Sequence, residues 1–315
     1  MNFRKIAALL ATCCLLFAVG CADTGTVDGE DKLKVISTVF APYDFAREVA
    51  GERADCSLLV PPGTEVHGYE PTARDMIAVQ ECDVFIYVGG ESDAWVTTLL
   101  SALDTSRIKL VTLMDCVELL HEEELPGLYD HDHDEEAHEE VYDEHVWTSP
   151  RNAALITDKL AAAFAAVDPA GAELYAANAA AYKQELSLLD AALEAVVSAA
   201  ARRTLVMADR FPLLYFARAY DLDYYAAFPG CASETEPSAA TVAFLIDKVK
   251  AEGIPVVLCL EMSNGRMADT ICEGSGAKKR TFHSCHNLTK DEMEAGETYL
   301  SLMYRNRDVL KEALG

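Results

Sequence analysis

The strongest constraint on the fold is a regular alternation of short apolar runs with helix-forming stretches, repeated on both sides of an Ala-rich segment. In the first half, the strand-like runs are KLKVISTVF, ADCSLLV, DVFIYVGG and IKLVTLM, separated by YDFAREVAG, PTARDMIAVQ and DAWVTTLLSAL. In the second half they are TLVMAD, LDYYAAF, IPVVLCLE and KRTFHS, interleaved with FPLLYFARAY, PSAATVAFLIDKVKAEG and DEMEAGETYLSLMYRNRDVLKEAL. Strands that alternate with helices build a parallel sheet covered on both faces. The sequence therefore predicts an α/β fold with two lobes, each containing a four-stranded, mostly parallel sheet.

The Ala-rich segment, Gly171 to Ala201, is predicted to be one long helix between the lobes. Its apolar side chains recur at spacings of four and three, as on one helix face: Tyr182, Leu186, Leu189, Leu193 and Val196. A helix of about 28 residues would be roughly 42 Å long at 1.5 Å per residue. We therefore expect a first lobe at 32–168, a rigid linker helix within 169–201 and a second lobe at 202–315, with small lobe movements rather than wide closure.

The N-terminus has the pattern of a bacterial lipoprotein signal. Arg4 and Lys5 precede an apolar run that is too short to span a bilayer as a mature helix. The run ends in Ala-Val-Gly-Cys at positions 18–21, which resembles a lipoprotein cleavage box. We expect a signal peptide at 1–20, lipidation of Cys21, a polar tether at 21–31, and an extracytoplasmic protein anchored to the bacterial cell membrane. The alternative is an ordinary signal peptide with an incidental cysteine.

Charge and cysteine content restrict the partners and the kind of site. The net charge is −26, with 52 Asp and Glu against 26 Lys and Arg. This balance argues against nucleic acid, because phosphate binding requires an excess of basic residues, and it favours cations. Seven cysteines remain beyond the signal and Cys21, an odd number that leaves at least one thiol without a partner in the chain. The sequence has no CxxC pair, so a structural zinc knuckle is not expected.

The placement of the histidines points to a metal site. His67 follows the strand-like run CSLLV in a Pro-Gly loop, at the strand edge where α/β proteins bind ligands. His145 lies just before a helix that is predicted to open at Ser149 and Pro150. His283 and His286 follow the last strand of the second half, and two carboxylates end earlier strands of that half: Asp209 and Glu261. Imidazole and carboxylate groups that converge on one cleft would suit Zn²⁺.

The segment 121–144, which ends directly before His145, is unusually rich in acid and histidine. From His121 to His145 there are twelve Asp or Glu, five His and no Lys or Arg. Such a composition cannot form a core and is typical of disordered segments. A solvated linker would not need histidine, whereas a metal-capturing one would. We therefore predict a loop that collects cations through His121, His131, His133 and His138.

At these residues the chain resembles the metal-binding lipoproteins of ABC-type zinc and manganese importers, the zinc-type periplasmic binding proteins of cluster A-I. The resemblance covers about Leu33 to Leu314. It is carried by PPGTEVHGYEPTARD, by DEHVWTSPRNA, by YFARAYDLDYYAAFPG followed by ETEPSAATVAFLIDKVK, and by VVLCLEMSNG. It implies two α/β lobes joined by one long helix, capture of Zn²⁺ in the cleft between them, delivery to the permease of an ABC importer in the membrane, and no enzymatic activity.

The resemblance transfers His67 and His145 as metal ligands directly. The family usually has a third ligand, a histidine, shortly before the aromatic segment ending in Tyr-Phe-Ala; this chain has VMADRFPLLYFARAY there, and Asp209 is the nearest replacement. The family's fourth ligand is Asp or Glu after the last strand, a position close to His283 in this chain. The expected ligand set is thus His67, His145, Asp209 and His283. The alternative ligands are Glu261, His286 and Glu236.

Two alternatives, manganese binding and adhesion, remain open at this point, and a third function, zinc hydrolysis, is not expected. Mn²⁺ would be credible as the ligand if carboxylates dominated the site, because it prefers oxygen. A surface adhesin of the same fold is a second alternative. A zinc hydrolase is not expected, because HEEEL at His121 has Leu125 where a metalloprotease helix needs its second histidine. The protein is expected to be a monomer.

Overall fold

Two four-stranded parallel sheets, one in each half of the chain, form the framework of the described part of the protein. The computed structural model describes residues 32–90, 93–123, 141–228, 230 and 237–315. Leu33–Gly315 is one compact unit. Residues 1–31 lie outside the described residues, so the signal peptide, the lipidation of Cys21 and the tether stay predictions.

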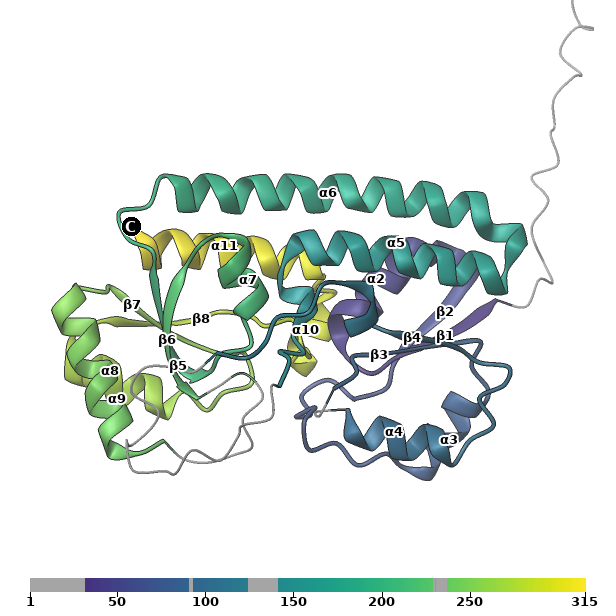
Figure 1. Cartoon of the computed structure of the whole chain (residues 1–315), viewed down its shortest axis with the longest axis horizontal. Coiled ribbons are helices and arrows are strands. Elements are labelled where there is room, and N and C mark those ends of the chain that lie inside the picture. The colour runs from purple at the N-terminus through teal and green to yellow at the C-terminus, as the bar shows by residue number, and fades with distance from the viewer. Residues whose placement is uncertain (1–31, 91–92, 124–140, 229, 231–236) are drawn as a thin grey trace, which may run out of the picture. The chain divides into compact units, whose positions relative to one another are not determined.

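The first sheet has the strand order β2-β1-β3-β4, with every neighbouring pair parallel. Its strands are β1 (Leu33–Ser37), β2 (Ala54–Leu58), β3 (Val84–Tyr87) and β4 (Lys109–Thr112). Its helices are α2 (Phe40–Ala50), α3 (Ala73–Gln80) and α4 (Ala94–Ser101), with short 3₁₀ turns at Gly51–Arg53 and Met114–Cys116. Figure 1 shows α3 and α4 on one face of this sheet and α2 on the other. Burial on both faces explains the nearly continuous apolar run of β3.

The second sheet repeats this arrangement with the order β6-β5-β7-β8, again parallel. Its strands are β5 (Thr204–Arg210), β6 (Asp223–Phe228), β7 (Val256–Cys259) and β8 (Lys278–Thr281). Its helices are α7 (Leu214–Ala219), α8 (Ala239–Glu252), α9 (Arg266–Ser275), α10 (Lys290–Ala295) and α11 (Tyr299–Leu314). The predicted α/β class with two parallel four-stranded sheets is confirmed.

A long helix, α6 (Ala172–Ser198, 27 residues), runs along both sheets and confirms the predicted helical connection. It packs antiparallel to α5 (Pro150–Val167), which follows the 3₁₀ turn Val146–Thr148, and the two are joined by a 3₁₀ turn at Pro169–Gly171. The buried side chains of α6 follow the expected spacing, except that Val197 is buried where Val196 was expected. They join a core that continues from the first sheet into the second. One shared core favours small movements of the lobes.

The C-terminal helix differs from its prediction because it is two helices. Gly296 ends α10 in the left-handed conformation (φ 72°), which glycine adopts without strain. Thr298 then begins α11 with a capping box in which its side chain accepts the backbone N–H of Ser301. Helical periodicity alone did not show this break. It places α10 directly after the turn that follows β8.

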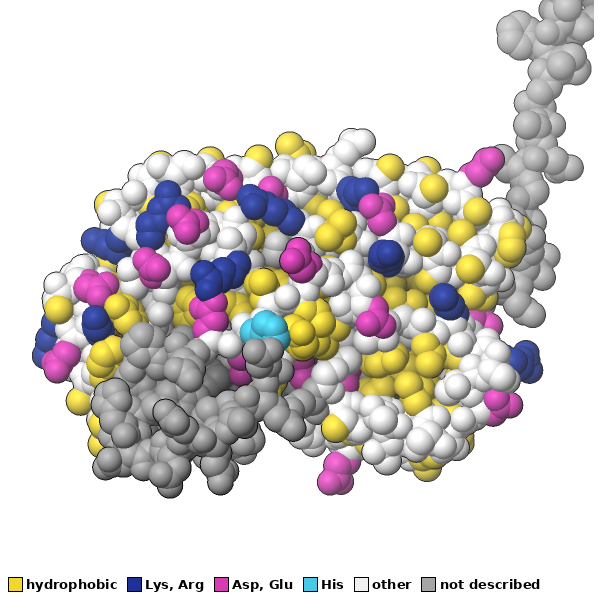
Figure 2. Space-filling model, viewed as in Figure 1, with side chains coloured by type: hydrophobic (Ala, Val, Ile, Leu, Met, Phe, Trp, Pro, Cys, Tyr) yellow, Lys and Arg dark blue, Asp and Glu magenta, His cyan; other side chains and the backbone are white. Residues whose placement is uncertain are grey.

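Three further features concern membrane-spanning helices, cysteines and surface charge. Among the described residues, no helix is long and apolar enough to cross a membrane. The described cysteines all carry free thiols: Cys56, Cys82, Cys116, Cys259, Cys272 and Cys285. On the face drawn in Figure 2, basic and acidic side chains alternate along α5 and α6, so the net negative charge forms no single acidic patch there.

Candidate metal centre

The first histidine is held in the loop between β2 and α3. The loop is closed at its far end by Thr72, which caps α3 in a capping box with Asp75. Within the loop, Glu65 folds back so that its Oε1 accepts the backbone N–H groups of Val66, at 3.1 Å, and His67, at 3.4 Å. Val66 is buried and anchors the loop to the core. The side chain of His67 is therefore presented by a braced loop at the carboxyl edge of the first sheet.

The second histidine, His145, is almost fully buried just before α5. Pro150 takes the first position of that helix, as predicted, and Ser149 occupies the N-cap position without making a side-chain capping bond. Asp143 braces His145 twice: its Oδ1 accepts the backbone N–H at 2.8 Å and lies 3.3 Å from Nδ1 of the ring. The longer contact is electrostatic rather than a well-formed hydrogen bond. A carboxylate at Nδ1 leaves Nε2 as the nitrogen free to bind a metal.

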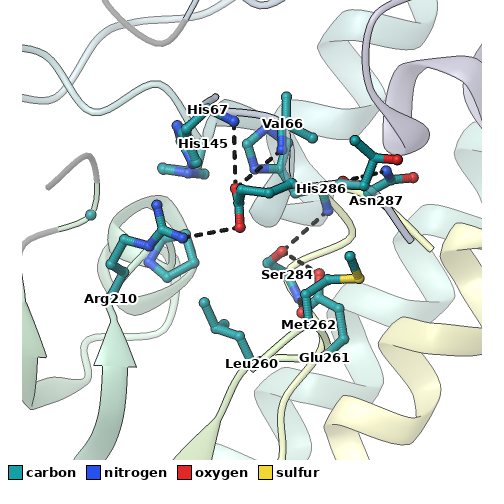
Figure 3. Close-up of a pocket in the computed structure, with 14 residues that line it drawn as sticks. Val66, His67, His145, Arg210, Leu260, Glu261, Met262, Ser284, His286 and Asn287 are labelled. Carbon is teal, nitrogen blue, oxygen red and sulfur yellow. Dashed lines mark hydrogen bonds and ion pairs between the residues drawn. The ribbon is translucent and has the colours of Figure 1, made fainter. Parts of the chain in front are cut away.

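The third histidine of the centre is His286, on the turn after β8. Ser284 begins this turn, and its Oγ accepts the backbone N–H of His286 at 3.2 Å. Cys285, between them, has a positive φ of 58°, an uncommon conformation for a residue with a side chain. The sharp turn directs His286 toward His67 and His145, as Figure 3 shows.

The imidazoles of His67, His145 and His286 form one group. Each offers a ring nitrogen, and these nitrogens all lie within 4.8 Å of one another. The ring centres are 5.0 to 5.9 Å apart. Nitrogens that share one tetrahedral zinc at about 2.0–2.1 Å are separated by about 3.4 Å, so small side-chain movements would suffice. The three rings line a cavity of about 40 Å³, room for an ion and a water molecule rather than for an organic solute.

The structure does not bring Asp209 or His283 into this group. Asp209 does not line the pocket, although its neighbour Arg210 does, and the register of β5 against β6 shifts between Met207 and Arg210. His283 is buried, and its Nδ1 accepts the backbone N–H of Cys285 at 2.9 Å. Its Nε2 lies 3.6 Å from Glu292. Both ring nitrogens of His283 are therefore engaged within its own lobe.

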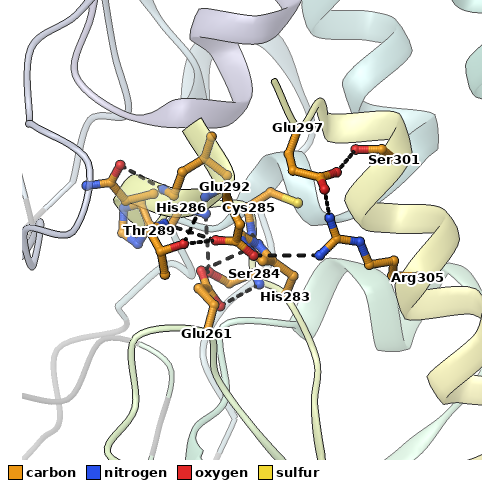
Figure 4. Close-up of polar contacts among 12 residues, drawn as sticks. Glu261, His283, Ser284, Cys285, His286, Thr289, Glu292, Glu297, Ser301 and Arg305 are labelled. Carbon is orange, nitrogen blue, oxygen red and sulfur yellow. Dashed lines mark hydrogen bonds and ion pairs between the residues drawn. The ribbon is translucent and has the colours of Figure 1, made fainter. Parts of the chain in front are cut away.

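Glu261, an alternative ligand by sequence, braces the turn that carries His286. One carboxylate oxygen accepts the backbone N–H of Ser284 at 2.9 Å, and the other accepts its hydroxyl at 2.6 Å (Figure 4). From the other side, Asn306 on α11 exchanges two hydrogen bonds of 2.7 Å with the backbone of His283. Outer partners of this kind orient a metal ligand. The other alternative ligand, Glu236, lies outside the described residues.

Arg210 and Glu65 are pocket residues that the sequence did not assign to the site. Arg210 ends β5, and its guanidinium lies 3.1 Å from Oε2 of Glu65 in the opposite lobe (Figure 3). Both line the cavity with the histidines. Glu65 stands two positions before His67, which could have marked it as a neighbour of the site. No local signal marks Arg210, because only the packing of the lobes places it there.

Electrostatics keep two of the imidazoles neutral. Burial lowers the pKa of His67 to about 4, assisted by the neighbouring His145 and Arg210 and opposed by Glu65. Burial also lowers the pKa of His286 well below its ordinary value, again with contributions from His67, His145 and Arg210. A neutral imidazole has one unprotonated ring nitrogen whose lone pair can coordinate a metal, so these rings can bind a metal at neutral pH without first losing a proton.

The predicted collecting segment is described only at its two ends. Its first histidine, His121, stacks on Tyr142 at 4.2 Å between ring centres, within a short antiparallel pairing of the two ends. Tyr215 on α7 ties them together, because its hydroxyl accepts the backbone N–H of Leu120 and donates to the carbonyl of Asp143. The segment thus starts and ends beside His145. The remaining predicted collecting histidines lie outside the described residues: His131, His133 and His138.

Comparison with known proteins agrees with this fold and identifies the family. The model of the periplasmic zinc-uptake complex component A, ZnuA, matches residues 35–313. The zinc-binding lipoprotein AdcA of Streptococcus pneumoniae is 35% identical over 98% of this chain, which spans 61% of AdcA's length. The high-affinity zinc uptake protein ZnuA of Bacillus subtilis is 28% identical over 99% of this chain and 98% of its own. Among solved structures, the Zn(II)-bound ZnuA-like domain of that AdcA has a TM-score of 0.74 at 32% identity and covers 90% of this chain and 99% of its own.

Two parallel α/β lobes, a connecting helix and histidines gathered at the strand edges define a metal-binding solute-binding protein of the periplasmic type. Within that class, the chain belongs to the ZnuA family of zinc-uptake components. This is a family of transport components rather than of enzymes. Zn²⁺ is the metal that the family and the named relatives support, and the names lipoprotein and periplasmic point to a location outside the cytoplasm.

Proposed function

We propose that this protein captures Zn²⁺ outside the cytoplasm with His67, His145 and His286 and delivers it to an ABC-type importer. The observation that carries the proposal is the convergence of three imidazoles on one small cavity at the edges of the two sheets. The zinc-binding relatives of the same fold support it.

The donor set favours Zn²⁺ over Mn²⁺ as the cargo. Three imidazole nitrogens suit zinc, whereas manganese prefers oxygen ligands and higher coordination numbers. The two strand-end carboxylates that would have favoured manganese do not join the ligand group: Asp209 does not line the cavity, and Glu261 lines it but accepts hydrogen bonds from Ser284 with both oxygens. Three protein ligands also leave one position of a tetrahedron open. An open position suits a cargo that must be released again.

Zinc titration of single variants tests the ligand set. The mature protein and the variants His67→Ala, His145→Ala and His286→Ala are stripped of metal and titrated in competition with a chromophoric zinc chelator. Each variant should weaken zinc binding about 100-fold or more, because each loses one of three ligands. His121→Ala is the matched control, because this exposed histidine stands outside the group, and it should bind like the parent. Parent-like affinity in all three variants would refute the site.

Metal analysis tests the cargo. The parent should bind Zn²⁺ more tightly than Mn²⁺ by several orders of magnitude in dissociation constant, following the general preference of nitrogen sites. Equal affinity for the two metals would contradict a zinc-selective site. His286→Asp provides a matched comparison, since exchanging an imidazole for a carboxylate should move the preference toward manganese.

Delivery to a permease and attachment through Cys21 complete the proposal and rest on the family and on the N-terminal pattern. Cys21→Ala should release the protein from the membrane fraction and lower zinc uptake by cells in zinc-poor medium. A parent-like membrane fraction in this variant would exclude lipidation.

The collecting role of the acidic segment also stays a prediction. Deleting residues 124–140 should lower uptake only when zinc is scarce and should leave the affinity of the purified protein unchanged.

A further inference from the structure

His286 follows β8 of the second sheet, but its turn is also tied to the first lobe, which carries His67 and His145. The backbone N–H of Phe40, at the start of α2, donates to the carbonyl of His286 at 2.9 Å. Next to it, the side-chain amide of Asn287 donates to the carbonyls of Pro61, at 3.0 Å, and Thr64, at 2.9 Å, in the loop that leads to His67. The three imidazoles therefore behave as one preformed unit.

Arg210 reaches this unit from the other side. It stands at the carboxyl end of β5, and only 20% of its side chain is exposed. Its guanidinium lines the same cavity as the three imidazoles, and it is one of the charges that act on the rings of His67 and His286. An arginine cannot bind a metal and is always charged. A fixed positive charge in a cation site works against binding.

Glu65 balances this charge. Its carboxylate lies 3.1 Å from the guanidinium of Arg210, so the pair has no net charge. The pair borders the metal cavity from both lobes. The side chain of Arg210 is 20% exposed and that of Glu65 is 43% exposed, so a charge left unbalanced in the pair would still act on a divalent ion in the adjoining cavity.

Building on the proposed zinc site, we propose that Arg210 and Glu65 set its affinity electrostatically, with Arg210 weakening cation binding and Glu65 offsetting it. Arg210 is then the residue that keeps a preformed three-histidine site from holding its cargo too tightly for release. Neither residue needs to be a ligand. The effect depends on the charge of the pair and not on the contact between the lobes.

Opposite effects of two charge-removing variants test this proposal. Zinc affinity is measured by chelator competition for the parent, Arg210→Gln, Glu65→Gln and the double variant. Arg210→Gln leaves a net negative pair and should tighten zinc binding about ten-fold or more, and Glu65→Gln leaves a net positive pair and should weaken it about ten-fold or more. The double variant is neutral again and should return to within about three-fold of the parent.

A purely structural role would give a different result. If the pair served only to latch the lobes, both single variants would bind zinc more weakly and the double variant would be no better, and this outcome overturns the proposal. Unchanged affinity in Arg210→Gln overturns it as well. Arg307→Gln removes a charge from α11, outside the cavity, and should leave the affinity unchanged. His67→Ala distinguishes failure of the proposed zinc site from failure of the proposed role of the pair. If His67→Ala abolishes zinc binding while Arg210→Gln has no effect, the zinc site stands and only the role of the pair fails.

Discussion

Acid should weaken zinc binding by this protein far less than it weakens ordinary histidine sites. Zinc binds the neutral imidazole, so a histidine that is protonated before binding must first lose its proton. The pKa of His67 is lowered to about 4, and that of His286 lies well below its ordinary value, chiefly because both rings are buried. At pH 5 the ring of His67 is therefore still mostly neutral, and the lowered pKa of His286 acts in the same direction.

The size of the effect follows from the three ligands. A histidine with a pKa near 6.5 is only about 3% neutral at pH 5, so three such ligands would lose roughly 30-fold each, about 10⁴-fold or 6 kcal/mol together. With His67 and His286 already neutral, at most one proton is displaced per zinc. Because one displaced proton changes the dissociation constant by at most about ten-fold per pH unit, we expect it to rise by no more than about 100-fold between pH 7 and pH 5.

Chelator competition at half-unit pH intervals measures this dependence, with the zinc affinity of the chelator calibrated at each pH. Calorimetry at pH 5.5 in two buffers of different ionisation enthalpy counts the released protons independently. A slope near three in a plot of log Kd against pH, or the release of two or more protons per zinc, would refute the neutral state of the buried rings. Circular dichroism over the same range controls for unfolding.

Three further predictions concern the supports of the site and of the fold. Glu261→Gln removes the charged acceptor that braces the turn of His286, so zinc affinity should fall about 10-fold to 100-fold in the chelator assay; an unchanged affinity would show that the turn holds its shape without it. Asp44 is fully buried and its pKa is raised to about 6 by burial, so its ionised form costs the folded state up to about 3 kcal/mol above pH 6, and nothing below about pH 4. Asp44→Asn should therefore raise the free energy of unfolding in urea at pH 7.5, and the gain should disappear toward pH 4; an equal gain at both pH values would contradict this. Gly90→Ala should lower stability by about 2 kcal/mol or more, because Gly90 has φ 85° and a Cβ there would approach Glu144 to 2.5 Å; a melting temperature equal to that of the parent would exclude the clash.

The class of fold could be predicted because it depends on local patterns. Buried parallel strands are apolar runs and surface helices repeat every 3.6 residues, and both patterns can be seen without knowing what packs on what. The long helix α6 was evident for the same reason, since Leu186, Leu189 and Leu193 mark one face without interruption by Gly or Pro. The break at Gly296 was missed because a single glycine can stand inside or at the end of a helix, and the contacts of α10 decide which.

The candidate site was only half determined by sequence. His67 and His145 could be placed because each stands at the end of a recognisable element, where parallel strands present their ligands. The choice between His283 and His286 could not be made, because they stand only three positions apart on one turn. That choice depends on the positive φ of Cys285 and on hydrogen bonds from Phe40 and other distant residues, which turn His286 into the cavity and His283 away from it.

By itself, the sequence determined the α/β lobes and the connecting helix, and it predicted two of the three proposed ligands, since each of these follows from the period or the boundary of one local segment. Only the tertiary structure decided the third imidazole and the pairing of Arg210 with Glu65, 145 positions apart in the chain. The physical reason is that these contacts form between loops of different lobes. Their geometry depends on how the two sheets pack against α6 and the shared core. The spacing of residues in the sequence does not predict that packing.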